Sequence, residues 1–433
     1  MQAYPNNWGL FLFTYAVSII FGAKNYVIFF IINAFAIAMI YKQLSEIGES
    51  YGLGKMAQLM ILLVGLLFYP ILLYSQMLYG HVLGIAFALT AIKYEEKYLK
   101  SHNVKLAIIS AMSISIAILF KSNMLIYLIA MLIVGFMHMV RTKEVKRTML
   151  LFCAIFICFE AQSNIPKVIL ENRTGYEMDN PCSTWAFIAM GLQESDLAPG
   201  WWNAYIQTSY SEANRNTAIQ SQLAKESIKQ SIMHFKDDHE YALEFFTKKI
   251  ASSWANPTLQ CYCIIRTGTN IEVPSWVTHF LSYQGQHKAN IYLNIVYFLL
   301  LMGALIGAIL NFKSSGFCNS LALPIVFAGG FLFNLFWEAK ARYTIMYFLP
   351  LIPYSILGYS LLLTEILSVA KRGFENKKKN VKYKLNKNYI YPLCVLLVSL
   401  ILIVTCYANR QHYKYLIQDT EEYYNYIDEA SGF

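Results

Sequence analysis

Charged residues are scarce in this sequence of 433 residues. Asp, Glu, Lys and Arg supply 14% of the chain, whereas they supply about 25% of an average soluble domain. Hydrophobic residues supply 57%, and the mean hydropathy is +0.40. Several apolar runs approach the roughly 20 residues that span a bilayer as a helix. The composition excludes a soluble globular protein and predicts an all-α polytopic membrane protein.

The sequence also lacks the short motifs of soluble nucleotide-binding and hydrolytic enzymes. It contains no P-loop, GxGxxG, HExxH or GxSxG sequence, so soluble-type phosphate, zinc or serine chemistry has no support. The eight cysteines lack the spacing of a metal site, and no metal ligand is predicted. Cys182, Cys261 and Cys263 lie in one polar segment, where they allow one disulfide and one free thiol, or no disulfide.

The apolar runs divide the chain into two membrane modules. Residues 1–162 are expected to hold about six spans and residues 290–407 about four. Residues 9–22 are short for a span, and the nearby aromatic residues favour a helix in the membrane interface instead. The apolar segments lie at residues 9–22, 26–41, 57–74, 78–92, 105–120, 123–139, 148–162, 290–311, 318–336, 343–366 and 389–407.

Basic residues predict which loops face the cytoplasm. They follow every second apolar segment, at Lys42 and Lys55, between residues 93 and 105, between residues 141 and 147, and between residues 371 and 387. The positive-inside rule places these loops, including 366–388, in the cytoplasm of a multi-pass cell-membrane protein. The net charge of +9 is concentrated in the last loop, so it indicates a membrane anchor and no nucleic-acid partner.

The other face of the membrane receives the one large polar region, residues 163–289, and the tail 408–433. Apolar residues recur at helical spacing between Ile219 and Ile250, which predicts helices there. This region is therefore expected to be a small external helical domain.

A charged junction lies on the same outer face, where two late spans meet. It contains Glu338, Lys340 and Arg342 and is followed by Tyr343. The planar fork of an arginine binds phosphate with two hydrogen bonds, so one hypothesis is a phosphate site at the membrane surface. The alternative is an anchor in which the basic side chains reach the lipid headgroups and Tyr343 marks the interface.

Two further polar turns are predicted on the outer face. Lys121 lies in a three-residue turn between two spans, where the positive-inside rule disfavours a lysine. Tyr79 and His81 open the fourth apolar segment. For Lys121 the alternative to a functional role is a solvated turn residue, and for His81 it is a structural histidine.

Together these residues resemble those of the GT-C superfamily of membrane glycosyltransferases. The likeness is to a Gram-positive bacterial branch of the protein mannosyltransferase and aminoarabinose transferase group. Residues 338–343 read EAKARY and are similar to an E-A-R-A-R-Y motif of that branch, residues 121–123 to a K/R-x-N turn, and residues 4–7 to its YPNN entry. The external stretches at 185–194, 198–205 and 245–258 are also similar, and the likeness runs from residue 4 to about 365.

The resemblance implies a GT-C-like helical bundle and inverting transfer of a sugar from a polyprenyl-phosphate donor to a cell-envelope acceptor. Membrane lipid is the other implied partner. The family's donor-phosphate residues correspond here to Arg342, Lys340 and Lys121. The residues expected to support them are Glu338, Tyr343, His81 and Tyr79.

The resemblance also implies an acidic residue in the first external loop, which activates the acceptor or orients a divalent metal. The first carboxylate of the chain is Glu46, in a predicted cytoplasmic loop. The catalytic acid is therefore expected in sequence upstream of residue 1, in a segment of about one span of ~20 residues and a loop. Two other functions stay open: a lipid-linked sugar transporter or flippase, and a non-catalytic accessory subunit. The ionisable residues lie at the outer rim, whereas transporters place their sites near mid-span.

Overall fold

The computed structural model describes residues 2–262, 274–311 and 321–374. The regular secondary structure of these residues is helical, without a strand. Within them, four helices are long and apolar enough to cross a membrane, or six if each of two bent pairs is one span. The prediction of an all-α polytopic membrane protein is confirmed. The apolar segment 389–407, the tail 408–433 and the basic loop beyond residue 374 lie outside the described residues.

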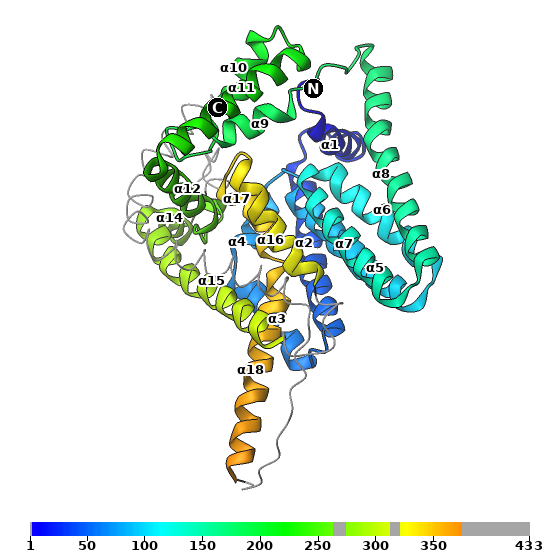
Figure 1. Cartoon of the computed structure of the whole chain (residues 1–433), viewed down its shortest axis with the longest axis vertical. Coiled ribbons are helices and arrows are strands. Elements are labelled where there is room, and N and C mark those ends of the chain that lie inside the picture. The colour runs from blue at the N-terminus through cyan, green and yellow to red at the C-terminus, as the bar shows by residue number, and fades with distance from the viewer. Residues whose placement is uncertain (1, 263–273, 312–320, 375–433) are drawn as a thin grey trace.

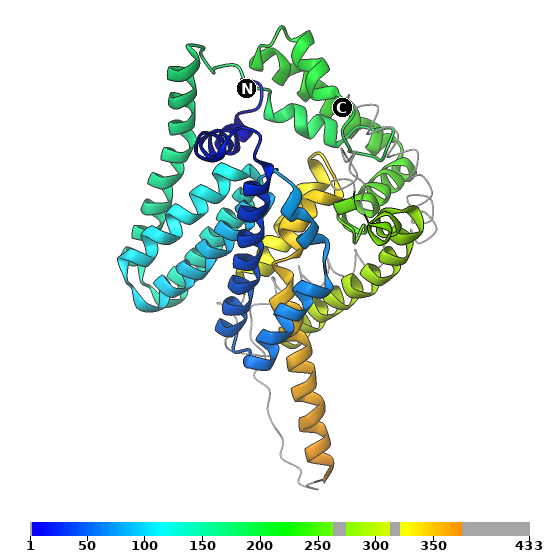
Figure 2. The ribbon, with the colours of Figure 1, turned by 180° about the vertical axis from the view of Figure 1, so that it is seen from behind.

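The first membrane module is a bundle in which α5 packs along α6 and α2 (Figure 1). The helix α1 is seen nearly end-on in both views while α2 runs along the long axis (Figures 1 and 2). The axis of α1 therefore lies across that of α2. The elements are η1 (Pro5–Asn7), α1 (Trp8–Phe21), α2 (Tyr26–Ser50), α3 (Lys55–Leu67), α4 (Pro70–Leu73), η2 (Tyr74–Gln76), α5 (His81–Ser101), α6 (Val104–Phe120), η3 (Ser122–Met124), α7 (Leu125–Thr142) and α8 (Val145–Thr174).

The helix α8 continues through residue 163, where the external domain is predicted to begin. It has 30 residues and contains Pro166. It ends where Gly175 adopts a left-handed φ of 71°, a conformation that terminates helices and is accessible to glycine. The polar region therefore starts as an extension of a membrane helix, and the change in hydropathy does not coincide with a helix end.

The predicted external region contains α9 (Thr184–Gly191), α10 (Tyr205–Glu212), α11 (Thr217–Asp237), α12 (His239–Trp254) and α14 (Ser275–Leu281). Asn216 and Asp238 cap the amide groups that begin α11 and α12. The helices predicted between residues 219 and 250 are therefore present. The helices α9, α10 and α11 lie at the opposite end of the molecule from the end of α18, the last described helix (Figures 1 and 2).

The second membrane module contains α15 (Tyr283–Asn311), α16 (Ala322–Phe336), α17 (Ala341–Phe348) and α18 (Leu351–Phe374). Two segments expected to be continuous helices are broken. Residues 57–74 bend by 59° between α3 and α4, and residues 343–366 bend by 53° between α17 and α18. Pro70 begins α4 and Pro350 precedes α18. Proline lacks an amide hydrogen and restricts the residue before it, so it interrupts helices at such positions.

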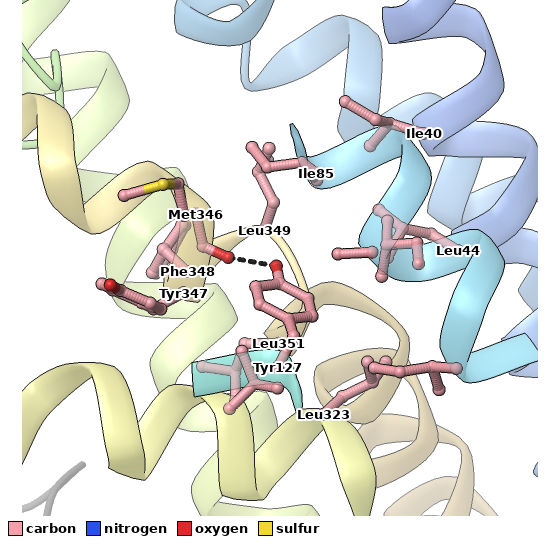
Figure 3. Close-up of a cluster of buried hydrophobic side chains, with 14 of the residues drawn as sticks. Ile40, Leu44, Ile85, Tyr127, Leu323, Met346, Tyr347, Phe348, Leu349 and Leu351 are labelled. Atoms are coloured by element: carbon pink, nitrogen blue, oxygen red, sulfur yellow. Dashed lines mark hydrogen bonds between the residues drawn. The ribbon is translucent and has the colours of Figure 1, made fainter. Parts of the chain in front are cut away.

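The two membrane modules share one hydrophobic core. Ile40 of α2, Ile85 of α5 and Tyr127 of α7 come from the first module and are fully buried. They belong to the same cluster of buried side chains as Met346 of α17 and Leu351 of α18, which are also fully buried (Figure 3). The hydroxyl of Tyr127 donates a hydrogen bond to the carbonyl oxygen of Met346. This continuous core fixes α17 relative to α5 and α7.

Candidate functional site

The turn before α5 lies directly against the end of α6. Gly80 in this turn has a φ of 75°, and a Cβ atom added to it would lie 2.3 Å from the carbonyl oxygen of Phe120. Both the backbone conformation and the close approach require glycine. The residue that follows Phe120 is Lys121, so this contact brings Tyr79 and Lys121 together.

Lys121 and Arg342 lie over the same pair of aromatic rings. The Lys121 Nζ atom is 4.2 Å from the ring centroid of Tyr79 and 5.3 Å from that of Tyr343. The Arg342 Cζ atom is 5.3 Å and 5.8 Å from the same two centroids. The ring faces are electron-rich and attract cations. The two tyrosines therefore hold two positive charges close together, although those charges repel each other.

His81 lies behind these rings and is almost completely buried, with 1% of its surface exposed. Its ring stacks on Tyr79 at a centroid distance of 4.7 Å and on Tyr343 at 6.0 Å. Within the described residues, neither of its ring nitrogens has a hydrogen-bond partner. A buried polar atom without a partner is costly, so this position is one where a water or a bound ligand would be stabilised.

Glu338 is the carboxylate that contacts this cluster from the connection between α16 and α17. Its Oε1 atom lies 3.2 Å from Lys340 Nζ and 3.4 Å from the hydroxyl of Tyr343. Glu338 is buried, whereas Lys340 and Arg342 are half-buried. Lys340 and Arg342 therefore form the accessible edge of the cluster, whereas Lys121 is buried.

Three helices begin at this cluster. His81 is the first residue of α5, Lys121 precedes η3 and α7, and Lys340 precedes α17. A helix N-terminus carries partial positive charge and exposed amide groups, so it favours anions and disfavours cations. Lys121 and Lys340 therefore lie at helix N-termini whose partial positive charge repels their ammonium groups. An anion bound among them would relieve that repulsion.

The titration of the groups outside the spans agrees with a strongly positive site. Burial would raise the pKa of Tyr79, but the charges of Lys121 and Arg342, together with the hydrogen bond to Tyr343, lower it. Burial lowers the pKa of Lys121, and the nearby Arg342 lowers it further. Burial also lowers the pKa of Lys340, although Glu338 opposes this shift. A bound anion would favour the charged form of both lysines and so raise the pKa of each.

Helices of the predicted external region hold the charged connection in place. The amide of Ala339 donates a hydrogen bond of 2.8 Å to the carbonyl oxygen of Gly200. The ammonium of Lys249, on α12, donates to the carbonyl oxygens of Gly191, Leu335 and Trp337. Lys249 is 1% exposed. These contacts link α9 and α12 to the end of α16, next to Glu338.

Sequence reasoning missed Lys249 and two residues that support the site from other elements. Asn33 of α2 donates hydrogen bonds to the carbonyl oxygens of Ser75 and Met77 and so holds the turn before Tyr79. The Gln260 side chain accepts a hydrogen bond of 3.3 Å from the amide of Arg342. A signal for Lys249 exists, because it follows the buried Phe245 by four residues and therefore shares its helix face.

The structure brings all of the sequence-predicted site residues into this one cluster. They are Lys121, Lys340, Arg342, Glu338, Tyr343, His81 and Tyr79. Within the described residues, no group of three or more His, Cys, Asp or Glu side chains is arranged to hold a metal ion. Cys182 and Cys261 are free thiols, and Cys263 lies outside the described residues.

Comparisons of the chain with protein-family models, with curated proteins and with solved structures find no match. The resemblance to the GT-C superfamily therefore rests on the sequence motifs alone.

Proposed function

We propose that this protein is a membrane glycosyltransferase that moves a sugar from a polyprenyl-phosphate donor to a hydroxyl group of a cell-envelope acceptor. The observation that carries the proposal is the convergence of Lys121, Lys340 and Arg342 with three helix N-termini at one place in a membrane-type helical protein. A lipid-linked phosphate is an anion that reaches such a place from the bilayer.

In the proposed reaction the acceptor oxygen forms a bond to the anomeric carbon of the sugar. The bond between that carbon and the phosphate oxygen breaks, and its electron pair leaves with the lipid phosphate. Lys121, Lys340 and Arg342 stabilise the negative charge that develops on the phosphate. The acceptor proton passes to a base on the opposite face of the sugar. Glu338 lies among the cations, on the phosphate side, so it is not placed to be this base.

The test uses the full chain in lipid nanodiscs with a polyprenyl-phosphate hexose and a polyprenyl phosphate. Binding of both lipids is expected. Transfer of labelled hexose to an envelope fraction is expected when the acceptor and the catalytic acid that the resemblance implies are both present. Arg342→Ala should weaken binding of both lipids by roughly tenfold to hundredfold and should lower transfer. Lys229→Ala, which removes an exposed cation on α11, should retain both. Equal lipid binding by the two folded variants, without transfer, would contradict the proposal.

One observation favours a second candidate, a flippase for a lipid-linked sugar. Transporters commonly build their substrate sites where helices are broken, and the two broken helix pairs meet here. The ring centroid of Phe68, the residue that follows α3, lies 5.4 Å from that of Phe348 at the end of α17. The ring of Tyr297 stacks on that of Phe348 at a centroid distance of 4.1 Å. These contacts are aromatic, whereas the cations lie at the other end of α17. Movement of a labelled lipid across vesicles without an acceptor would favour the flippase.

A further inference from the structure

Glu95 of α5 is a buried carboxyl group in the first membrane module, away from the cationic cluster. It lies about 20 Å further along the helix than His81, the first residue of α5. Glu95 is 2% exposed. Within the described residues it takes part in no ion pair, and its Oε1 atom has no hydrogen-bond partner. A buried carboxylate without a cation is strongly unfavourable, so Glu95 holds its proton here.

The Glu95 carboxyl lies where α5 packs against α7. A Cβ atom added to Gly135 of α7 would lie 3.5 Å from Glu95 Oε1 and 2.8 Å from the Cε1 atom of Phe152 on α8. Gly135 therefore leaves room for the carboxyl group beside an aromatic ring. Ionisation of Glu95 would place an unpaired charge between these helices, so the packing of α5 on α7 depends on this proton.

The other charged groups near this end of α5 are paired or exposed. Glu46 of α2 pairs with Lys93, and Glu96 pairs with Lys100. Glu96 also repels a negative charge on Glu95. The exposed charged residues of these elements are Lys42 and Glu49 of α2, Lys97 of α5, Lys105 of α6, Arg141 of α7, Lys143 between α7 and α8, and Lys146 of α8.

Two histidines lie on the same helix faces as this contact, nearer to the predicted cytoplasmic loops. His102 follows Glu95 by seven residues at the end of α5, and His138 follows Gly135 by three residues on α7. The histidines meet at Glu144, because their Nε2 atoms each lie 3.4 Å from one of its carboxylate oxygens. The Nδ1 atom of His102 is buried and has no hydrogen-bond partner within the described part of the chain.

The cluster around Glu144 reaches solvent. The Glu144 side chain is 28% exposed and pairs with Arg147 over 2.8 Å. Tyr98, between Glu95 and His102 on α5, donates a hydrogen bond to the carbonyl oxygen of Arg147. Histidine takes up and releases protons near neutral pH, and chains of acidic residues and histidines carry protons in membrane proteins. Titratable groups therefore lead from water to the buried carboxyl.

We infer that Glu95 is a proton-binding site inside the helical bundle, and that His102, His138 and Glu144 exchange its proton with water at the predicted cytoplasmic face. In this exchange the O–H bond of the carboxyl group breaks and the carboxylate keeps the electron pair. The proton passes to the histidines and then to water. The site is independent of the proposed function, although it lies on the helix whose first residue belongs to the cationic cluster.

The first experiment records infrared spectra of the full chain in lipid nanodiscs. At about pH 7, where exposed carboxyl groups are ionised, the parent protein should show the carbonyl band of a protonated carboxyl. Glu95→Gln should lose this band and stay folded, because the amide resembles the neutral carboxyl. Glu96→Gln removes the neighbouring, paired carboxylate and should keep the band. If Glu95→Gln does not fold, Glu95→Asp keeps a carboxyl group and should shift the band.

The second experiment follows the same band after transfer to deuterium oxide, which replaces the carboxyl hydrogen and lowers the band frequency. The rate of this shift should fall by about tenfold or more in the double variant His102→Asn/His138→Asn, because the groups that accept the proton are removed. His287→Asn, which removes an exposed histidine of α15, should leave the rate unchanged. Glu144→Gln, which keeps both histidines, provides a second variant and should also slow the shift.

A parent spectrum without the protonated-carboxyl band, or the same band in folded Glu95→Gln, would overturn the proton site. Equal rates of deuteration in the parent, the double histidine variant and Glu144→Gln would overturn the exchange path assigned to His102, His138 and Glu144. Neither result depends on lipid binding at the cationic cluster, so both are distinct from a failure of the proposed function.

Discussion

The ammonium of Lys249 donates a hydrogen bond of 3.0 Å to the main-chain carbonyl of Trp337, the residue before Glu338. It donates a second bond of 2.9 Å to Leu335 and a third to Gly191. One buried lysine thus binds the last carbonyl groups of α16 and a carbonyl at the end of α9. Cations are favoured at helix C-termini, so this contact holds the charged connection against the external helices.

Replacement of Lys249 should loosen this connection. Lys249→Met leaves three buried carbonyl oxygens without their donor, and each such loss costs about 1–3 kcal/mol. We expect a lower melting temperature and weaker lipid-phosphate binding. The neighbouring Lys248, which is half-exposed and paired with Glu244, provides the matched control. Lys248→Met should change neither property, and equal effects of the two substitutions would contradict the role assigned to Lys249.

The same lysine should make stability depend on pH. Burial lowers the pKa of Lys249 to about 7 in the folded protein, from an ordinary value of 10.5. Between these values the unfolded chain binds more protons than the folded chain, so the contribution of Lys249 to stability rises with pH and is lowest below pH 7. The melting temperature of the parent protein should therefore rise relative to Lys249→Met from about pH 7 to about pH 9. A constant difference between the two would disprove this titration.

Arg342 should be needed for phosphate binding as an arginine and not only as a charge. Arg342→Ala removes a charge-assisted contact worth about 1.5–3 kcal/mol, which is roughly a tenfold to hundredfold loss of affinity. Arg342→Lys should lose less, because it keeps the charge but not the planar fork. Lipid-phosphate titrations of the folded variants distinguish this from an interfacial anchor, for which alanine would leave the affinity unchanged.

Tyr79 should support lipid-phosphate binding through the face of its aromatic ring and not through its hydroxyl group. Tyr79→Phe keeps the surface over which Lys121 and Arg342 lie at 4.2 Å and 5.3 Å, so lipid-phosphate binding should be retained. Tyr79→Ala removes two cation–π contacts, together worth about 1–4 kcal/mol, and should weaken binding by about fivefold or more. Equal losses in both variants would instead assign the effect to the hydroxyl group.

The charge of Lys121 should limit binding at alkaline pH. Burial and the neighbouring Arg342 lower the pKa of Lys121, so this lysine loses its proton at a lower pH than an exposed lysine does. Lipid-phosphate affinity should therefore fall on the alkaline side of neutrality. In Lys121→Arg the side chain stays charged across this range, and the fall should be smaller. Identical pH profiles for the two proteins would exclude Lys121 as the titrating group.

Sequence reasoning found this cluster because alternation of the spans determines which turns share a face. Tyr79, Lys121 and Arg342 each follow an even number of predicted crossings, counted from the segment 26–41, so they are predicted on one face. The structure brings Lys121 and Arg342 within a few ångströms of the Tyr79 ring. The contact between Gly80 and Phe120 could not be derived in this way. It depends on how closely two helices approach, and hydropathy contains no information about that distance.

Helical periodicity predicted α11 and α12 but not the faces that they bury. Ile219, Leu223 and Leu243 are 45%, 39% and 71% exposed, whereas Lys249 is buried. The buried face depends on the partner helices, and the partner of Lys249 is the end of α16, 86 residues further along the chain. The broken spans were missed for a different reason, because an average over a hydrophobic window gives no weight to Pro70 or Pro350 as helix breakers.

The orientation of the chain in the membrane is the remaining prediction. The basic loops place the external helices and the tail outside, and the loop 371–387 inside. Single cysteines introduced at Ser211, which is exposed on α10, and at Asn380 separate the two sides. In intact cells an impermeant maleimide should label the Ser211→Cys variant above the parent background, and the Asn380→Cys variant only after permeabilisation. The reverse pattern would place the cationic cluster in the cytoplasm, where a donor exposed at the outer leaflet could not reach it.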